Sequence, residues 1–194
     1  MVGQPLPVRA ARVKAVAKPT RTMQLLNFVL FQAAWFAGVL GAARNVPLLG
    51  TMVVVAVIAW HVLVSTRPAA EAKLVGAALL IGAAFETCCV QLGQVTFASG
   101  QPDPRFAPYW MVAMWGLLAI ALNVTMRWMK RRWLLAAALG AIAGPMSYAA
   151  GVHLGAATFR QPSAALATLA IGWALLMPLM MWLSDRFDGV ATHG

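Results

Sequence analysis

The chain has 194 residues, of which 61% are hydrophobic and only 10% are charged, whereas soluble domains are about 45–50% apolar and about 25% charged. This composition excludes an ordinary soluble domain and indicates an integral membrane protein. The formal net charge of +10 would suggest a nucleic-acid partner in a soluble protein, but here the basic residues flank apolar stretches, where topology and anionic lipid explain them, so we expect no nucleic-acid binding.

Residues 1–22 form a basic leader without acidic residues. Five of its residues are Lys or Arg and three are Pro. Proline disfavours one continuous helix, so we expect a flexible cytoplasmic segment that lies close to anionic lipid headgroups. An organelle transit peptide is the alternative, because such peptides are also rich in Arg and poor in acidic residues.

Six apolar stretches follow, each close to the length of about 20 residues that crosses a bilayer as a helix. They are Leu25–Ala43, Val46–Ser65, Ala72–Gly93, Pro108–Met126, Trp133–Gly155 and Ala164–Leu183. Their apolar runs are continuous and not alternating, which is typical of helices and not of barrel strands. We therefore predict an all-α fold, a polytopic bundle of six transmembrane helices at residues 23–184, with a short cytoplasmic tail at 185–194.

The distribution of Lys and Arg predicts the orientation of this bundle. With the N-terminus in the cytoplasm, twelve basic residues lie on the cytoplasmic side and three lie outside. Cytoplasmic segments of membrane proteins carry such an excess of positive charge. We therefore expect both termini to lie inside.

The third stretch contains Glu86, the only acidic residue within the six stretches. A carboxylate in hydrocarbon is costly and usually faces a partner or a cavity, so Glu86 is a candidate functional residue. The alternative is a protonated carboxyl group with a purely structural role.

The third stretch also resembles the fifth at a constant offset, which aligns Glu86 with Tyr148. The matching residues are Gly82 with Gly144, Val90 with Val152, Leu92-Gly93 with Leu154-Gly155, and Thr96-Phe97 with Thr158-Phe159. A weaker similarity relates residues 37–43 to residues 150–157. All three stretches are predicted to run outward, so we expect helical hairpin repeats of the kind that some transporters use. The alternative is that helix ends rich in small residues look alike by composition.

Small residues recur four positions apart in the fifth stretch. Gly140 and Gly144 form one pair, Gly151 and Gly155 form a second, and Ser147 lies between them on nearly the same face. Small residues at this spacing let helices approach closely in a membrane. We expect this face to pack against another helix or a partner protein.

Polar residues fall into two layers when depth is taken at 1.5 Å per residue. Glu86 and Tyr148 lie at one depth in the outer half, and Gln91 and His153 follow nearer the outer surface. These four residues are the candidate ligand-binding site. His61, Asn123 and Gln32 form a second candidate layer, about 8–10 Å from the cytoplasmic face. Hydrogen bonding between helices is the alternative role for this second layer.

The motif inventory argues against catalysis. The sequence has no G-x-S-x-G, H-E-x-x-H or P-loop motif, and Cys88 and Cys89 are adjacent without metal-binding spacing. We therefore predict no catalytic residue, no metal and no cofactor, and we do not expect an enzyme.

Several motifs together resemble domain-of-unknown-function family 2878 in their order and spacing. They are Asn27-Phe-Val-Leu-Phe-Gln32 with Trp35-Phe36, Val39-Leu-Gly-Ala-Ala43, Pro108-Tyr-Trp110 with Trp115, Leu122-Asn123, Gly140-Ala-Ile-Ala-Gly-Pro145 with Tyr148, and Gly172-Trp-Ala-Leu-Leu-Met-Pro178. The resemblance covers roughly residues 25–184. It implies a multi-pass protein of the bacterial inner membrane and supplies no catalytic residue.

Three functions remain open at this point. The leading hypothesis is a carrier or binding protein for a small molecule or lipid, neutral or cationic, with an outward-side polar site at Glu86 and Tyr148. The second is a structural or accessory subunit of a membrane protein complex. A membrane-embedded lipid-modifying enzyme is a weaker third. Expected partners are the lipid bilayer and either a second copy of the chain or another membrane protein.

Overall fold

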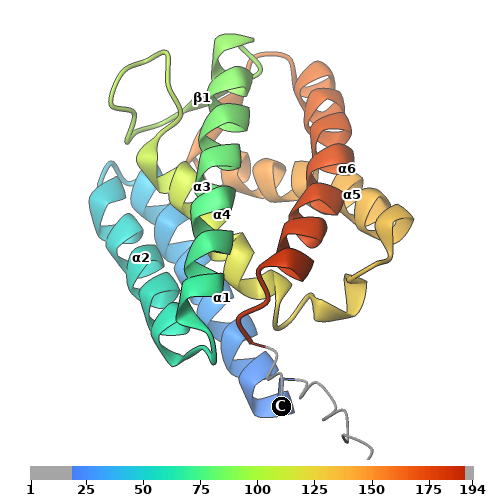
Figure 1. Cartoon of the computed structure of the whole chain (residues 1–194). Helices are drawn as coiled ribbons and strands as arrows, with labels where there is room; N and C mark the ends of the chain where they lie inside the picture. The colour runs from blue at the N-terminus through green and yellow to red at the C-terminus, as the bar shows by residue number, and fades with distance from the viewer. Residues whose placement is uncertain (1–18, 191–194) are drawn as a thin grey trace, which may run out of the picture.

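Six α-helices make up most of the chain between residues 19 and 190, the range that the computed structural model describes. Residues 1–18 of the predicted leader and the last four residues lie outside this range. The elements are α1 (Arg21–Ala43), α2 (Pro47–Val64), α3 (Pro68–Gln91), β1 (Val95–Phe97), α4 (Tyr109–Leu122), the 3-10 helix η1 (Arg127–Met129), α5 (Trp133–His153), β2 (Ala157–Phe159) and α6 (Pro162–Arg186). The helices form a bundle in which α5 crosses the others at a steep angle (Figure 1).

The residues at the helix starts explain several of the boundaries. Pro47, Pro68 and Pro162 each stand in the first turn of their helix, where proline already has the helical φ and loses no intrahelical hydrogen bond. Thr20 caps α1, because its hydroxyl oxygen accepts from the backbone N–H of Met23 at 3.2 Å.

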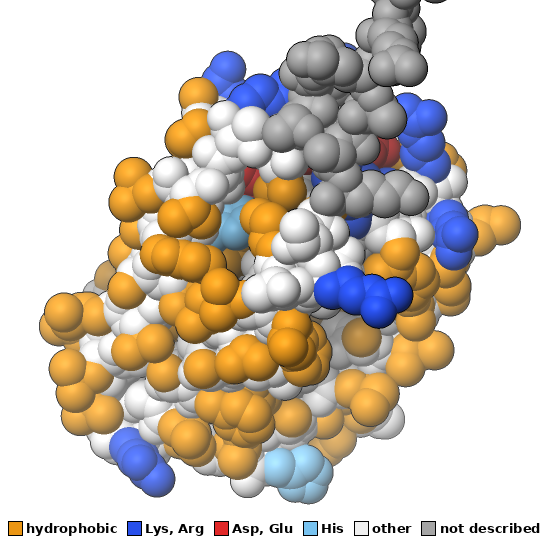
Figure 2. Space-filling model, turned by 90° about the horizontal axis from the view of Figure 1, so that it is seen from below, with side chains coloured by type: hydrophobic (Ala, Val, Ile, Leu, Met, Phe, Trp, Pro, Cys, Tyr) orange, Lys and Arg blue, Asp and Glu red, His pale blue; other side chains and the backbone are white. Residues whose placement is uncertain are grey.

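The surface of the bundle is apolar, as a lipid environment requires. α1, α2, α3, α5 and α6 are each long and apolar enough to cross a membrane. Large apolar side chains stay exposed on them, among them Leu80, Leu134 and Leu175, which are 71–88% exposed. Hydrophobic side chains cover most of the face in Figure 2, and most of its Lys and Arg side chains gather toward one end. The predicted all-α membrane bundle is confirmed.

α4 differs from the other helices in both length and burial. Nine of its 14 residues are buried, and it contacts α1, α2, α3 and α6. The predicted fourth stretch, Pro108–Met126, is too long, because the helix ends at Leu122. At the next residue, the Asn123 side chain donates to Glu71 Oε1 at 2.7 Å and to the carbonyl of Phe187 at 3.2 Å. The backbone then turns instead of continuing the helix.

Two short strands, which the apolar pattern did not predict, join the ends of α3 and α5. β1 pairs antiparallel with β2, and Thr96 lies opposite Thr158. Each strand follows a glycine with positive φ, Gly93 at 64° and Gly155 at 86°, a conformation that costs glycine little. The two repeated segments of the sequence are therefore paired with each other.

Matched residues of α3 and α5 also make matched contacts. A Cβ atom at Gly82 would lie 2.2 Å from Trp115 Cγ, and one at Gly144 would lie 2.3 Å from Trp173 Cγ. The two glycines thus admit one indole each from the following helix. The indoles stack on each other, with ring centroids 4.8 Å apart and planes at 17°. The similarity between α3 and α5 in sequence therefore extends to this one contact with the following helix.

The weaker third copy has a different register from the one that the sequence suggests. α1 ends with the same backbone hydrogen bonds as α3 and α5, and Asn45 takes the positive-φ place of Gly155. These hydrogen bonds align Gly41 with Gly151, whereas the similarity in sequence aligns Gly38 with Gly151. Since many helices end in this way, the helix end alone does not make α1 a third repeat.

Candidate functional site

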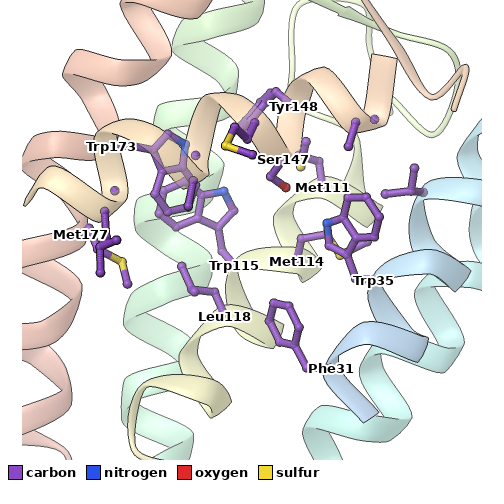
Figure 3. Close-up of a pocket in the computed structure, with 18 of the residues that line it drawn as sticks. Phe31, Trp35, Met111, Met114, Trp115, Leu118, Ser147, Tyr148, Trp173 and Met177 are labelled. Atoms are coloured by element: carbon purple, nitrogen blue, oxygen red, sulfur yellow. The ribbon is translucent and has the colours of Figure 1, made fainter. Parts of the chain in front are cut away.

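A cavity of about 700 Å³ lies between α1, α4 and α5, with further wall residues from α3 and α6. α1 packs against α2 and α4, whereas α5 packs closely against α6, and the cavity fills the space between these two groups. In Figure 3, α5 passes along one edge of the cavity, from α6 toward α1. Phe31 and Trp35 of α1 lie beside Met111 and Met114 of α4 on one side of it (Figure 3).

Apolar side chains form most of the cavity wall, with aromatic residues and methionines prominent among them. Polar side chains come from five described residues, and none of the described lining residues is Lys, Arg or His. The five polar residues are Gln32, Glu86, Thr125, Ser147 and Tyr148. Ligand pockets in proteins usually combine such an apolar wall with a few polar groups, at volumes of about 300–1,000 Å³. The size and the composition therefore suit a small molecule with a largely apolar body.

Glu86 supplies the only carboxyl group of this wall within residues 19–190. The residue is 0% exposed. The indole N–H of Trp115 donates to its Oε1 at 2.8 Å, and the hydroxyl of Tyr148 donates to the same oxygen. Oε2 is buried without a hydrogen-bond partner in the described part of the chain. One carboxyl oxygen is thus held by the protein, and the other has no partner among the described residues.

The packing of the two hairpins sets this geometry. Glu86 and Tyr148 hold equivalent places on α3 and α5, one helical turn beyond Gly82 and Gly144. Because each glycine lets the indole of the next helix come close, Trp115 reaches Glu86 and Trp173 stacks beside it. The structure therefore brings Glu86 and Tyr148 together, as their matched depths suggest. Their role in binding stays a proposal.

The small residues of α5 divide between two faces, which corrects the expected single packing face. Gly140 and Gly144 pack against α6, where an added Cβ would lie within 2.7 Å of its atoms. Gly140, Gly144, Ser147 and Gly151 all border the cavity, but Gly151 has no neighbouring helix against it. A Cβ at Gly151 would meet nothing within 4 Å. The second half of α5 therefore presents its small residues to open space and not to a packed helix.

Gln91 and His153 lie apart from this cavity. Both side chains are exposed, they stand at the last residues of α3 and α5, and neither lines the cavity. Gln32 of the second predicted layer does line it. Gln32 therefore lines the same cavity as Glu86, and Gln91 and His153 lie at the surface.

The side chains of His61 and Asn123 both contact Glu71, a residue that the sequence analysis does not propose. Glu71 is 0% exposed. His61 Nε2 lies 3.1 Å from its Oε2, and Asn123 and the backbone N–H of Gly189 donate to its Oε1 at 2.7 and 2.8 Å. Glu71 stands one residue before the predicted third stretch, so that prediction places it in the preceding loop. Glu71 lies in the first turn of α3 and His61 lies at the end of the preceding helix. These two positions in the sequence could have indicated the contact.

Ion pairs extend this Glu71 cluster to the end of α6. Arg127 Nη1 lies 2.7 Å from Asp188 Oδ2, and Lys130 Nζ lies 2.8 Å from the same oxygen. Burial lowers the pKa of the Lys130 ammonium below its usual range, and the neighbouring Asp188 carboxylate opposes this shift. These contacts join the turns after α2, α4 and α6, so their evident role is to hold this end of the bundle together.

Within residues 19–190, no three His, Cys, Asp or Glu side chains lie close enough together to hold a metal ion.

Comparison with known proteins places the chain in a family but does not supply an activity. A family model described as "Protein of unknown function (DUF2878)" matches residues 24–179. No curated protein and no solved structure matches the chain.

Proposed function

Since the chain belongs to this family of unknown function, we propose a function from the site alone: the protein binds, and carries within the membrane, a small amphiphilic molecule or lipid. The observation that carries the proposal is the cavity of about 700 Å³ in which one buried carboxyl oxygen, Glu86 Oε2, lacks a partner. A buried polar atom without a hydrogen bond costs about 1–3 kcal/mol. A ligand that bonds to Oε2 would remove this cost.

The position of the cavity favours a ligand that comes from the bilayer. Ile142 and Met146 both line the cavity, yet they are 60% and 65% exposed. Both residues lie on α5, whose outer surface is apolar like that of the other long helices. The cavity therefore continues to a surface that suits lipid, and an amphiphile can reach Glu86 without crossing water. We place the protein in the bacterial inner membrane on the resemblance given above.

The test is native mass spectrometry of the full chain, extracted gently from a bacterial membrane. Wild type is compared with Glu86→Gln, which changes the polar group, and with Gly151→Leu, which fills open space in the cavity wall. Gly76→Leu is the matched control, because Gly76 of α3 also has nothing within 4 Å of an added Cβ and does not line the cavity.

The expected result is a bound small molecule in wild type and Gly76→Leu that is reduced in Glu86→Gln and lost in Gly151→Leu. Equal retention in all four proteins would contradict the proposal. A co-purifying protein without any bound small molecule would contradict it too, and would favour the accessory-subunit hypothesis.

A further inference from the structure

The charges of the residues around the cavity limit the chemical class of ligand that it can bind. Glu86 faces Trp115 of α4 and Tyr148 of α5, Trp173 of α6 stacks on Trp115, and Gln32 of α1 is a further polar residue of the described wall. All four of these residues are uncharged. The protein thus offers a buried carboxyl group without supplying a cation from any of the elements around the cavity.

Both hydrogen bonds to Glu86 favour its ionised form. An indole N–H and a phenol O–H donate to Oε1, and donation to a carboxylate stabilises the charged state. A buried carboxylate nevertheless needs a positive partner, because an uncompensated charge in an apolar site is costly. A cation on the ligand would supply this partner and make the ionised form favourable despite the burial.

The rest of the wall suits a cation with an apolar body. Trp35, Trp115, Tyr148 and Trp173 all line the cavity, and Figure 3 shows their rings around the space beside α5. Aromatic faces attract ammonium groups, most strongly where water is absent. Met111, Met114 and Met177 add adaptable apolar surface.

We propose that the ligand is a lipophilic amine, an alkyl or aryl body with a protonated nitrogen that donates a hydrogen bond to Glu86 Oε2. This inference rests on the proposed function and makes its ligand class specific. Anionic amphiphiles are disfavoured, because they would place a second negative charge beside Glu86 with no basic side chain in the described wall.

The test compares three probes that share a 12-carbon chain and differ only in the headgroup: dodecylamine, dodecanol and dodecanoate. The full chain is reconstituted in nanodiscs of zwitterionic phosphatidylcholine at neutral pH. Binding is read from native mass spectra and from quenching of tryptophan fluorescence, with each probe at the same mole fraction in the bilayer. Wild type, Glu86→Gln and Gly151→Leu are compared.

The expected result is that wild type prefers dodecylamine over dodecanol by about tenfold or more, as a hydrogen bond between charged groups would give. Glu86→Gln removes most of this preference, and Gly151→Leu removes binding of every probe. Equal binding of amine and alcohol in wild type, or tighter binding of dodecanoate, would overturn the amine proposal while leaving a cavity ligand in place. Probe binding that Gly151→Leu does not reduce would overturn the proposed function as well. The wild-type preference needs no variant, so poor folding of Glu86→Gln leaves the test intact.

Discussion

Two buried glutamates of this protein have opposite surroundings. Glu71 and Glu86 are both 0% exposed. Both oxygens of Glu71 have partners, from His61 on one side and from Asn123 and Gly189 on the other. Only one oxygen of Glu86 has partners, and the other stays unpaired in a cavity wall. The Glu71 carboxyl group is fully paired within the described residues, although Asn123 Oδ1 beside it lacks a partner, and the Glu86 carboxyl group is half paired, which is why we propose a structural role for Glu71 and a binding role for Glu86.

The residue-scale prediction concerns Glu71. Glu71→Ala removes the acceptor for Asn123, His61 and the backbone N–H of Gly189, and Asn123 keeps only its hydrogen bond to the carbonyl of Phe187. We expect a loss of about 3–5 kcal/mol, as for other buried pairs that lose one member. Thermal unfolding in detergent, followed by size-exclusion chromatography, measures the effect. Asp103→Asn is the control. Asp103 lies on an exposed loop, and among the described residues its ion pair is with Arg105.

Unchanged thermal stability of Glu71→Ala would show that the Glu71 cluster does not hold this end of the bundle. The same variant should retain any small molecule that wild type carries, provided it stays folded. Loss of the ligand from a folded Glu71→Ala protein would instead connect the cluster to the cavity.

At the scale of the element, α5 performs two tasks along its length. Its first half carries Gly140 and Gly144, which let α6 approach. Its second half carries Ser147, Tyr148 and Gly151, which face the cavity. A continuous small-residue face would have bound α5 to a neighbour over its whole length. α5 packs closely against α6, and the second half of α5 also borders the cavity.

The element-scale prediction uses three glycines. Gly144→Ala places a Cβ 2.3 Å from Trp173 Cγ, and Gly82→Ala places one 2.2 Å from Trp115 Cγ. Overpacking of this kind costs about 1–3 kcal/mol, so both variants should unfold at lower temperature than wild type. Gly76→Ala has open space and gains up to about 1 kcal/mol of helix propensity. Equal stability of all three variants would show that the indole stack does not depend on the two glycines.

The sequence predicted the helices well because the length and continuity of apolar runs determine them. It also suggested Glu86 with Tyr148, since the repeat places both at one depth. The cavity could not be predicted, because it depends on the angle at which α5 crosses the bundle, and no periodicity encodes that angle. Glu71 was missed because a stretch boundary drawn from hydropathy excludes an acidic residue in the first turn of a helix.

At the scale of the whole molecule, the chain enters and leaves the bundle at one end. The start of α1 and the end of α6 lie together, opposite the end that carries β1 (Figure 1). The contact of Gly189 with Glu71 at the start of α3 agrees with this view. Five crossings would leave the two ends on opposite sides, so we predict that α4 is a sixth. Its 14 residues span about 21 Å, and since protein surrounds most of it, it need not match the thickness of the lipid.

The prediction at this scale is therefore that α4 crosses the membrane and that both termini are cytoplasmic. Single cysteines are introduced by Arg105→Cys, before α4, and by Arg132→Cys, after it, in a chain in which Cys88 and Cys89 are replaced by Ala. Both arginines are exposed. A membrane-impermeant maleimide added to intact bacterial spheroplasts should label Arg105→Cys, and it should label Arg132→Cys only after the membrane is permeabilised. The predicted orientation follows from the accumulation of Lys and Arg on the cytoplasmic side. The opposite labelling pattern would reverse this orientation without changing the number of crossings. Labelling of both positions from one side would mean that α4 turns back within the membrane, and the six-span arrangement would then be wrong.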